Sequence, residues 1–582
     1  MQNNSVAAGM WGRQGEPVPS LYAPPGTRSR PGSAAPPALQ DPRAGHWDPR
    51  GVARCDRSPR EAPGWSSNAR APRPLVPCSM VLRESPFANR FLSGLYSLGQ
   101  YLLFPSYWAA DCLLDLRETT AEQQQNQCRP CPLRALVTGP LLLLLLLLSM
   151  PVALLGLLLW LPLQAARRPF AYKHTAPSRH PEPWELPGTG KAFSFVSANV
   201  CLLPDGLAKF SNLGQMKQRV ARIGQRLTQG EASASPRSSQ FLLPTKYGTT
   251  MSSPRRSGSS ARCPDASVAV EIPDGQGGAG PGEISVPFPP DVDFLCLQEV
   301  FDQRAGARLC QLLSPFYEHI VYDVGTCGLP GCCTLKVFNS GLFLASRYPV
   351  LAAQYHCYPN GTGEDALSAK GLLSVQVQLG EAQGQRIVGY LNCTHLHAPA
   401  ADAQIRCDQL TLGLFWVQLF QDAHTEQGDV IAFDVFCGDF NFDNCSSGDE
   451  LEQTHIIFRQ YQDPCRVGPR QDKPWAIGTL LNYLEIYEEA VSTPEKLKRT
   501  LEQEEGRRKY LACPILQDGC PDPSAAGSPW EGRRIDYILY REHPAPISLT
   551  TEVEKFSFIT QLAGCSDHMA VGLRLLLNPA PQ

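Results

Sequence analysis

The stretch Val430-Ile-Ala-Phe-Asp-Val-Phe-Cys-Gly-Asp439-Phe-Asn441-Phe-Asp443 combines an apolar run with a polar end. The run is rich in β-branched and aromatic residues, which predicts a buried strand over Val430–Asp439. Asp439 and Asn441 then stand at the carboxyl end of that strand. Side chains at strand ends often carry function, because the sheet positions them rigidly. A single carboxylate there more often caps a turn, so a functional interpretation needs support from the rest of the chain.

Seven other short runs downstream of residue 190 are β-rich: Phe193–Asn199, Asp293–Leu297, Ser340–Ala345, Leu372–Leu379, Arg386–His395, Ile535–Tyr540 and Ala570–Leu577. Helical patterns lie between them, at Met216–Gln229, Asp402–Ala423 and Thr493–Leu511. Residues 231–283 interrupt the series with Ser, Gly, Pro and Arg, so we interpret them as a low-complexity insertion. The mixture of long and short connections predicts an α/β sandwich over residues 190–577 rather than a simple parallel sheet.

Polar residues stand at or near the ends of these runs: Asn199, Glu299, His395, Asp439, Asn441, Asp536 and His568. Mg²⁺ binds carboxylate and amide oxygens and keeps waters for a phosphate substrate, which suits Glu299 and Asn199. A histidine oriented by a carboxylate takes a proton from water near neutral pH, which suits His568 with Asp536. Taken singly, each residue is better explained as a cap or a core side chain. Their order along one domain favours metal-assisted phosphoryl transfer.

Other functional classes are disfavoured by motifs and by charge. The chain has no glycine-rich phosphate loop with Lys, no Gly-x-Ser-x-Gly turn and no His-Glu-x-x-His helix. These absences argue against a nucleotide kinase, an α/β-hydrolase and a zinc protease. With 52 Lys plus Arg against 55 Asp plus Glu, the net charge is −3, which also argues against a protein that coats nucleic acid.

The first 79 residues differ in composition from the rest of the 582. They hold 14 of the 53 prolines and ten Arg but no Lys, without apolar periodicity. So little apolar surface cannot offset the entropy lost on ordering, which predicts a disordered extension over residues 1–79. Met80 is a candidate second start of translation. The 21 cysteines are too sparse for a small disulfide scaffold, which favours a reduced intracellular protein.

Two apolar segments, residues 91–116 and 141–163, make residues 80–170 a predicted membrane-anchoring region. The second segment has 23 residues without a charge and includes eight consecutive leucines, enough to cross a bilayer. Pro151 stands in its middle, so the sequence leaves open whether the segment spans or re-enters. A slight excess of Lys and Arg after this segment favours a cytosolic C-terminal part.

Taken in order, six motifs resemble the endonuclease/exonuclease/phosphatase superfamily: Asn199, Leu297-Gln-Glu-Val, Thr394-His-Leu, Gly438-Asp-Phe-Asn, Arg534-Ile-Asp-Tyr and Ser566-Asp-His. This resemblance implies a four-layer α/β sandwich that hydrolyses phosphate esters with Mg²⁺. Longer matches narrow it to the membrane-anchored neutral sphingomyelinases, among which the chain is most similar to the mitochondria-associated form. These longer matches include Ala198-Asn-Val-Cys-Leu-Leu-Pro-Asp and Cys437-Gly-Asp-Phe-Asn-Phe-Asp-Asn-Cys, together with the two apolar segments. That family hydrolyses sphingomyelin to ceramide and phosphocholine.

The resemblance implies roles at the metal and at the nucleophile. Glu299 is expected to bind Mg²⁺, with Mn²⁺ as a substitute, and Asn199 to lie beside it as a second metal ligand. His568 is expected to be the general base that activates water, and Asp536 its orienting partner. Water would attack phosphorus directly, with no covalent intermediate.

The resemblance also implies roles around the phosphate. Asp439 is expected to support catalysis there, Asn441 to contact phosphate oxygens, and His395 to stabilise the phosphate or the leaving group. Lys370 and Asp365 match a charged pair that switches the active site in these enzymes. We therefore count Lys370 among the substrate-binding residues.

The implied partners are a membrane containing sphingomyelin and anionic phospholipids that activate the enzyme, but no nucleic acid. Four arginines that flank the second apolar segment are candidates for the lipid contacts, or act only as topology determinants: Arg129, Arg134, Arg167 and Arg168. The implied location is an intracellular membrane, of mitochondria or of the endoplasmic reticulum, with the catalytic domain facing the cytosol.

Four cysteines are candidates for S-acylation, with inert or buried thiols as the alternative: Cys128, Cys131, Cys332 and Cys333. Three sequons match glycosylation acceptors, at Asn360, Asn392 and Asn444. Glycans at the last two would obstruct the predicted site, which again favours a cytosolic domain. Two alternatives to the sphingomyelinase remain, namely an inositol phosphate phosphatase or nuclease of the same fold, and a catalytically silent membrane scaffold.

Overall fold

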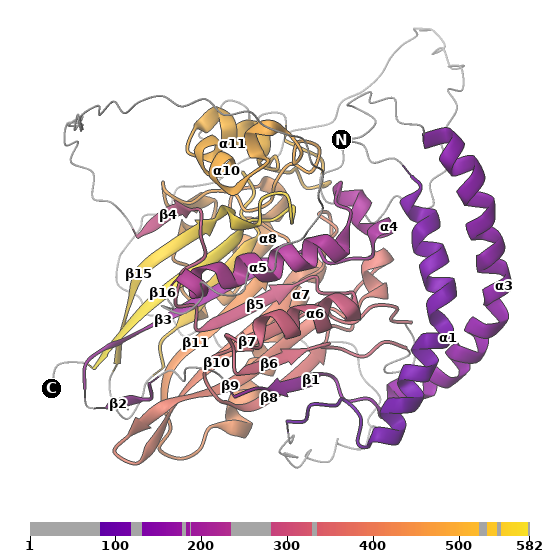
Figure 1. Ribbon diagram of the computed structural model, residues 1–582. Coiled ribbons are helices and arrows are strands. Elements are labelled where there is room, and N and C mark those ends of the chain that lie inside the picture. Colours follow the sequence, from indigo (N-terminus) through magenta and orange to yellow (C-terminus); the bar gives the residue numbers. More distant parts are fainter. Residues whose placement is uncertain are drawn as a thin grey trace, which may run out of the picture. The chain divides into compact units, whose positions relative to one another are not determined.

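Two stacked β-sheets form the centre of the part of the chain that follows residue 170 (Figure 1). This computed structural model describes residues 82–117, 131–176, 182–186, 188–233, 281–328, 335–522, 532–543 and 549–579. The predicted extension 1–79 and most of the predicted insertion lie outside these residues. So do Cys128, Arg129, Cys332 and Cys333, as well as the side chains of Cys131 and Arg134.

The two sheets contain the predicted strands and several others. The first has the order β1 (Ala171–His174), β6 (His319–Tyr322), β7 (Phe343–Ser346), β5 (Phe294–Gln298), β3 (Lys191–Asn199), β16 (Ala570–Pro579), β15 (Leu549–Ile559) and β4 (Gly282–Ser285). The second has the order β14 (Asp536–Arg541), β11 (Val430–Asp439), β10 (Gln385–His395), β9 (Gly371–Ala382) and β2 (Trp184–Leu186), and β8 (Val350–Cys357) also pairs with β9. A separate hairpin pairs β12 (Arg466–Gly468) with β13 (Gln471–Asp472).

Aromatic side chains fill the space between the sheets. Phe433 of β11 contacts three rings of the first sheet, with centroids 5.4 Å from Phe193, 4.9 Å from Phe195 and 5.4 Å from Phe294. All four side chains are buried. Each buried ring contributes roughly 1.5–3 kcal/mol of hydrophobic stabilisation relative to exposure. This aromatic cluster joins strands that lie far apart in the sequence.

Helices cover the outer faces of both sheets. On the first sheet, α5 (Met216–Ser233) and α6 (Gln303–Leu313) contribute Ile223 and Leu309 to one core with Leu295 of β5. On the second sheet, α7 (Ala403–His424) contributes Leu410 to a core with Phe436 of β11. The layers are therefore helix, sheet, sheet, helix, which confirms the four-layer α/β sandwich.

Shorter helices complete the sandwich, and one expected helix is divided. The predicted helix over Thr493–Leu511 is two helices, because the first ends at Leu501 and the second begins at Glu504. Within the described residues, the other helices after residue 170 are α4 (Asp205–Ala208), α8 (Glu450–Gln453), α9 (Ile457–Gln460), α10 (Pro494–Leu501) and α11 (Glu504–Tyr510). Short 3₁₀ turns occur at Lys209–Ser211, Gly363–Leu367, Ser447–Asp449, Glu489–Val491 and Thr560–Leu562.

The two predicted apolar segments are the antiparallel helices α1 (Arg90–Asp115) and α3 (Cys131–Ala166) (Figure 1). Small residues let them pack closely: the hydroxyls of Ser106 and Ser149 are 2.6 Å apart, and a side chain on Gly156 would collide with Leu102. α3 continues as one helix through Pro151. In the described residues, Leu136–Ala166 is the one helix long and apolar enough to cross a membrane.

Candidate active site

The pairing of the strands brings the predicted catalytic residues to one end of the sandwich. In the second sheet His395 of β10 lies opposite Asp439 of β11, and Asp439 lies opposite Asp536 of β14. In the first sheet Asn199 ends β3 beside Gln298, the last residue of β5, so that Glu299 follows directly. The strand ends of both sheets therefore carry the polar residues toward each other.

Asn199 connects the two sheets at this end. Its side-chain nitrogen donates to Glu299 Oε1 at 2.9 Å and to Asp439 Oδ2 at 3.0 Å. Its side-chain oxygen accepts from the backbone N–H of Cys201 at 3.0 Å. In this arrangement the amide orients two carboxylates. Its predicted role as a metal ligand stays a prediction.

Glu299 adopts a backbone conformation that favours glycine, with a φ of 60°. Gly341 packs against Glu299, and a Cβ at this position would lie 3.0 Å from the Glu299 Cα. Only glycine therefore lets the backbone at residue 341 approach Glu299 so closely. Backbone strain of this kind costs about 1–3 kcal/mol and persists where the surrounding structure enforces it. Burial, together with the charge of Asp567, raises the pKa of Glu299 to about 7.

His568 lies next to two carboxylates. Its Nδ1 is 2.9 Å from Asp536 Oδ2, and its Nε2 is 3.9 Å from Asp439 Oδ2. Burial by itself lowers the pKa of His568, but Asp536 and Asp439 outweigh it and raise the pKa well above its usual value. Burial raises the pKa of Asp439 to about 6, although His568 acts in the opposite direction. The predicted pair of His568 and Asp536 is therefore present as a hydrogen-bonded pair.

His395 stands on the other side of Asp439. Its Nε2 lies 3.5 Å from Asp439 Oδ2 and 4.0 Å from Glu299 Oε1. Burial and the nearby Lys370 charge lower the pKa of His395 well below its ordinary value, so the ring is neutral. A neutral imidazole is able to donate one hydrogen bond without carrying a charge.

Lys370 is buried next to this cluster and paired with Asp365. Its Nζ lies 2.7 Å from Asp365 Oδ1 and donates to the carbonyl of Leu396 at 3.0 Å. Asn441, with a φ of 57°, donates its side-chain N–H to the same carbonyl at 3.0 Å. Burial would raise the pKa of Asp365, but Lys370 and His397 hold it well below its usual range. His397 contacts Asp365 at 2.9 Å and therefore belongs to this charged pair rather than to the His568 cluster.

The carboxylates of Glu299 and Asp439 fit a divalent cation, with Asp439 buried and Glu299 half-buried. Glu299, His395 and Asp439 offer ligand atoms within 4.8 Å of one another. Neither carboxylate forms an ion pair with Lys or Arg in the described part of the chain. Burying an ionised carboxylate without a cation is costly. Hard oxygen ligands of this kind are the ones that Mg²⁺ prefers.

Two residues that position the site were not predicted. Thr479 accepts hydrogen bonds at 3.1 Å from the backbone N–H groups of Ile535 and Asp536 and so fixes the start of β14. Ser566 donates to the carbonyl of Asn199 at 2.7 Å and ties the His568 loop to β3. Thr479 lies in no recognisable motif, whereas Ser566 stands within the Ser-Asp-His motif.

Two family models match the chain. Residues 282–568 match the endonuclease/exonuclease/phosphatase family, which is the class that the sandwich and the polar strand ends define. Residues 91–166 match the neutral sphingomyelinase N-terminal transmembrane region, which covers α1 and α3. The N-terminal part therefore associates with a membrane.

Curated relatives identify the family within this class. Sphingomyelin phosphodiesterase 5 of Danio rerio is 44% identical over 546 residues, which cover 86% of this chain and 99% of that protein. Sphingomyelin phosphodiesterase 3 of Mus musculus is 37% identical, again over 86% of this chain and 99% of that protein. The chain belongs to the neutral sphingomyelinases, the membrane-anchored sphingomyelin phosphodiesterases.

Solved structures are also similar to part of the chain. Sphingomyelinase C from Streptomyces griseocarneus is 16% identical with a TM-score of 0.32, over 66% of this chain and 99% of that one. An endonuclease/exonuclease/phosphatase from Beutenbergia cavernae is 15% identical with a TM-score of 0.34, over 67% of this chain and 72% of that one.

Proposed function

We propose that this protein hydrolyses sphingomyelin to ceramide and phosphocholine at a membrane surface, with Mg²⁺ as cofactor. The observation that supports it most is the pair of His568 and Asp536, 2.9 Å apart, beside the cluster of Glu299, His395 and Asp439. A base, its orienting carboxylate and a candidate cation site thus meet at one end of the sandwich. This is the set that direct attack of water on a phosphodiester requires.

The residues divide the work as follows. Glu299 would hold the cation, and Asn199 holds Glu299 and Asp439 in place through two hydrogen bonds. When bound, Mg²⁺ supplies positive charge that offsets the carboxylates and polarises the phosphate. His568 has to be neutral to act as the base, and a bound cation would favour that form by offsetting the charge of Asp439, which otherwise raises the pKa of His568. Neutral His568 then takes a proton from the attacking water at Nε2, while Asp536 fixes the tautomer at Nδ1 and stabilises the imidazolium that forms.

The opposite side of the site handles the phosphate. His395 is neutral and donates a hydrogen bond to a phosphate oxygen or to the departing ceramide oxygen. Asn441 contacts phosphate oxygens. Its backbone conformation is left-handed, and Asp439 fixes this turn of the chain because the Asn441 backbone N–H donates to Asp439 Oδ1 at 2.9 Å. Lys370 contributes positive charge from behind this turn and is itself fixed by Asp365.

In this proposal the chain has three parts: an extension over residues 1–79, an anchor over residues 80–170 and a catalytic domain over residues 190–577. The anchor lies in an intracellular membrane, mitochondrial or of the endoplasmic reticulum, and the catalytic domain lies in the cytosol. The buried sequons support this side of the membrane, because Asn392 and Asn444 are each 1% exposed. Anionic phospholipids are the proposed activators. Arg167 is already bound to the carbonyls of Asp323 and Gly325, which argues against that role for this arginine.

The test measures phosphocholine release from sphingomyelin in mixed micelles that contain anionic lipid. We expect release with Mg²⁺, none with EDTA, and a loss of at least about 10²-fold in His568→Ala, the lower range for a general base. His174→Ala serves as the matched control, because that side chain is 53% exposed on β1, away from the cluster.

Folded protein that releases no phosphocholine with Mg²⁺ and anionic lipid present would contradict the proposal. Hydrolysis of inositol phosphates or of abasic DNA by the same preparation would replace the substrate and retain the mechanism. Activity that persists in His568→Ala would retain the substrate and remove the proposed base.

A further inference from the structure

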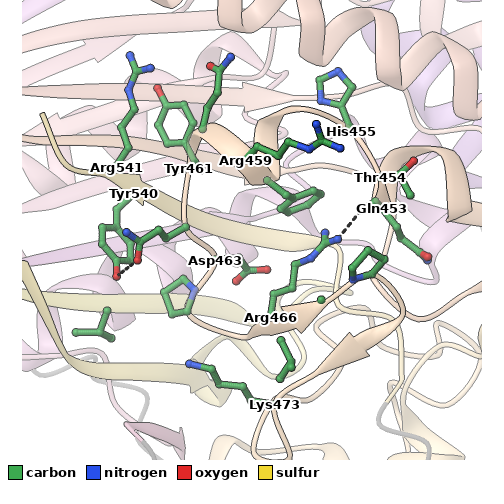
Figure 2. A pocket seen from close by; sticks show the side chains of 18 of the residues that line it. Gln453, Thr454, His455, Arg459, Tyr461, Asp463, Arg466, Lys473, Tyr540 and Arg541 are labelled. Atoms are coloured by element: carbon green, nitrogen blue, oxygen red, sulfur yellow. Dashed lines mark hydrogen bonds between the residues drawn. The ribbon is translucent and has the colours of Figure 1, made fainter. Parts of the chain in front are cut away.

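A second polar cavity lies at the end of the second sheet opposite to the candidate active site. It has a volume of about 820 Å³ and is bordered by α9, by the β12–β13 hairpin and by the end of β14 (Figure 2). β14 begins at Asp536 in the active site and ends at Arg541 in this cavity. Five residues of extended chain measure about 17 Å, so the two sites are separate.

Positive charge predominates in the lining. Four cationic side chains border the cavity: Arg459, Arg466, Lys473 and Arg541. Of these, Arg541 is paired with the buried Asp434 at 2.6 Å. The other three have no carboxylate partner in the part of the chain that the structure describes. Their charges are therefore available to a ligand.

The two acidic residues of the lining do not balance these charges. Asp463 lies 2.8 Å from Arg534, which also binds Asp472 at 2.7 Å, so one guanidinium compensates one of these two carboxylate charges. Glu542 is exposed and accepts a hydrogen bond from the backbone N–H of Thr551 at 3.2 Å. Two uncompensated negative charges, one shared by Asp463 and Asp472 and one on Glu542, therefore face three cations, and the lining keeps an excess of positive charge.

Arg466 lines the cavity, and two contacts fix the position of its guanidinium. Its guanidinium lies 3.9 Å from the ring centre of Phe458, and it donates to the carbonyl of Gln453 (Figure 2). Its Nη1 is buried and has no hydrogen-bond partner in the described chain. Burial lowers the pKa of Arg466, although the charges of Asp463 and Asp472 act in the opposite direction.

We propose that this cavity binds a phosphate-bearing anion, with Arg466, Lys473 and Arg459 as its ligands. A guanidinium presents a planar pair of donors that matches a phosphate, and a lysine supplies a point charge. The volume is in the range of cavities that bind small molecules and is far larger than a single phosphate needs. The ligand is therefore a phosphorylated small molecule or the phosphorylated headgroup of a lipid.

The experiment measures binding by isothermal titration calorimetry, with full-length protein in uncharged detergent and EDTA present. One arm titrates inositol hexakisphosphate and the other vesicles of phosphatidylcholine with phosphatidylinositol bisphosphate. We expect saturable binding that Arg466→Gln and Lys473→Gln each weaken by about tenfold, the value for one charge-assisted contact. Lys473→Gln keeps the test valid if Arg466→Gln fails to fold.

Matched variants distinguish the cavity from general surface charge and from the active site. Arg470→Gln removes the same charge from the same hairpin, at a residue that does not line the cavity, and is expected to bind normally. Asn441→Ala alters the active site and is expected to bind normally as well. Binding in the first arm identifies a soluble ligand, and binding in the vesicle arm alone identifies a headgroup. No saturable binding in either arm, or equal weakening by Arg470→Gln, would overturn the proposal.

Discussion

Glu299 is a half-buried carboxylate, with 19% of its side chain exposed and no Lys or Arg paired to it in the described chain. The missing charge partner has opposite consequences for stability with and without metal. Burial raises the pKa of Glu299 to about 7, which reports the free-energy cost of its charge. Without metal, Glu299→Gln is therefore expected to be at least as stable as the wild type. With Mg²⁺, wild type is expected to gain about 2.7 kcal/mol at a hundredfold excess over Kd, and the variant to gain little.

Thermal unfolding with and without Mg²⁺ measures both effects, and phosphocholine release is expected to fall by about 10³-fold in the variant, since metal assistance supplies several kcal/mol. Glu283→Gln is the control, because Glu283 is paired with Lys555 at the surface. A variant that Mg²⁺ still stabilises as strongly as wild type would remove Glu299 from the cation site.

The buried pair of Lys370 and Asp365 has a cost that only a double substitution reveals. Removing one partner leaves an uncompensated buried charge, so Lys370→Met and Asp365→Asn are each expected to lose about 3–5 kcal/mol of unfolding free energy. The double variant is expected to lose less than the sum, because neither charge remains unpaired. Urea unfolding measures the three values, and additive losses would show that the two side chains do not interact.

At the scale of elements, sequence pattern predicted the buried strands and the ends that carry the site. Val430–Asp439 was predicted with the bounds that β11 has, because both of its faces are buried and most of its residues are apolar. β15 was missed, since Leu549–Ile559 begins with polar residues that alternate with half-buried ones near the edge of the sheet. Thr479 could not be predicted, because its contact with β14 joins residues 57 apart in the chain.

Asp434 shows what holds β11 in place among its neighbours. It is fully buried and accepts from Asn392 of β10 at 2.8 Å, Gln421 of α7 at 2.8 Å and Arg541 of β14 at 2.6 Å. Burial alone would raise the pKa of Asp434, but His543 and Arg541 hold it below its ordinary value. One carboxylate thus connects two strands and a helix to β11.

This depressed pKa predicts a dependence of stability on pH. The unfolded carboxyl has a pKa of about 3.9, so the stabilisation by Asp434 is complete above that pH and is lost as the pH falls toward the lower folded pKa. Asp434→Asn is expected to lose about 3–5 kcal/mol at neutral pH and to lose less than wild type on acidification. Urea unfolding at neutral pH and near pH 3 tests this, with the exposed Asp422→Asn as control. Parallel pH profiles of wild type and Asp434→Asn would contradict it.

At the scale of the whole molecule, the sequence predicted the class of the sandwich but not how its sheets meet. The order of motifs predicted four layers, and the apolar segments predicted the helices of the anchor. Which strands lie next to each other depends on contacts such as Phe433 with Phe195, which are distant in the sequence and chemically ordinary. Local periodicity contains no information about such contacts. Pro151 illustrates the same limit, because the sequence left open whether it interrupts the apolar segment, and α3 continues through it as one helix.

We also expect the packing between the sheets to control the geometry of the active site, because Asn199 and Asp439 belong to different sheets. Phe433 lies against three rings of the first sheet, and a side chain at Gly389 would meet its ring at 2.3 Å. Phe433→Ala is expected to cost about 3–5 kcal/mol, because the tightly packed rings cannot collapse into the space. Phe415→Ala, at a ring that is 57% exposed on α7, is expected to cost less than about 0.5 kcal/mol. Urea unfolding compares the two. Phosphocholine release is then measured at urea concentrations at which both variants remain folded. If only Phe433→Ala releases less than wild type, the spacing of the sheets sets the distance between Glu299 and Asp439, which Asn199 joins. If the activity of folded Phe433→Ala is normal, the strand ends hold the site without that spacing.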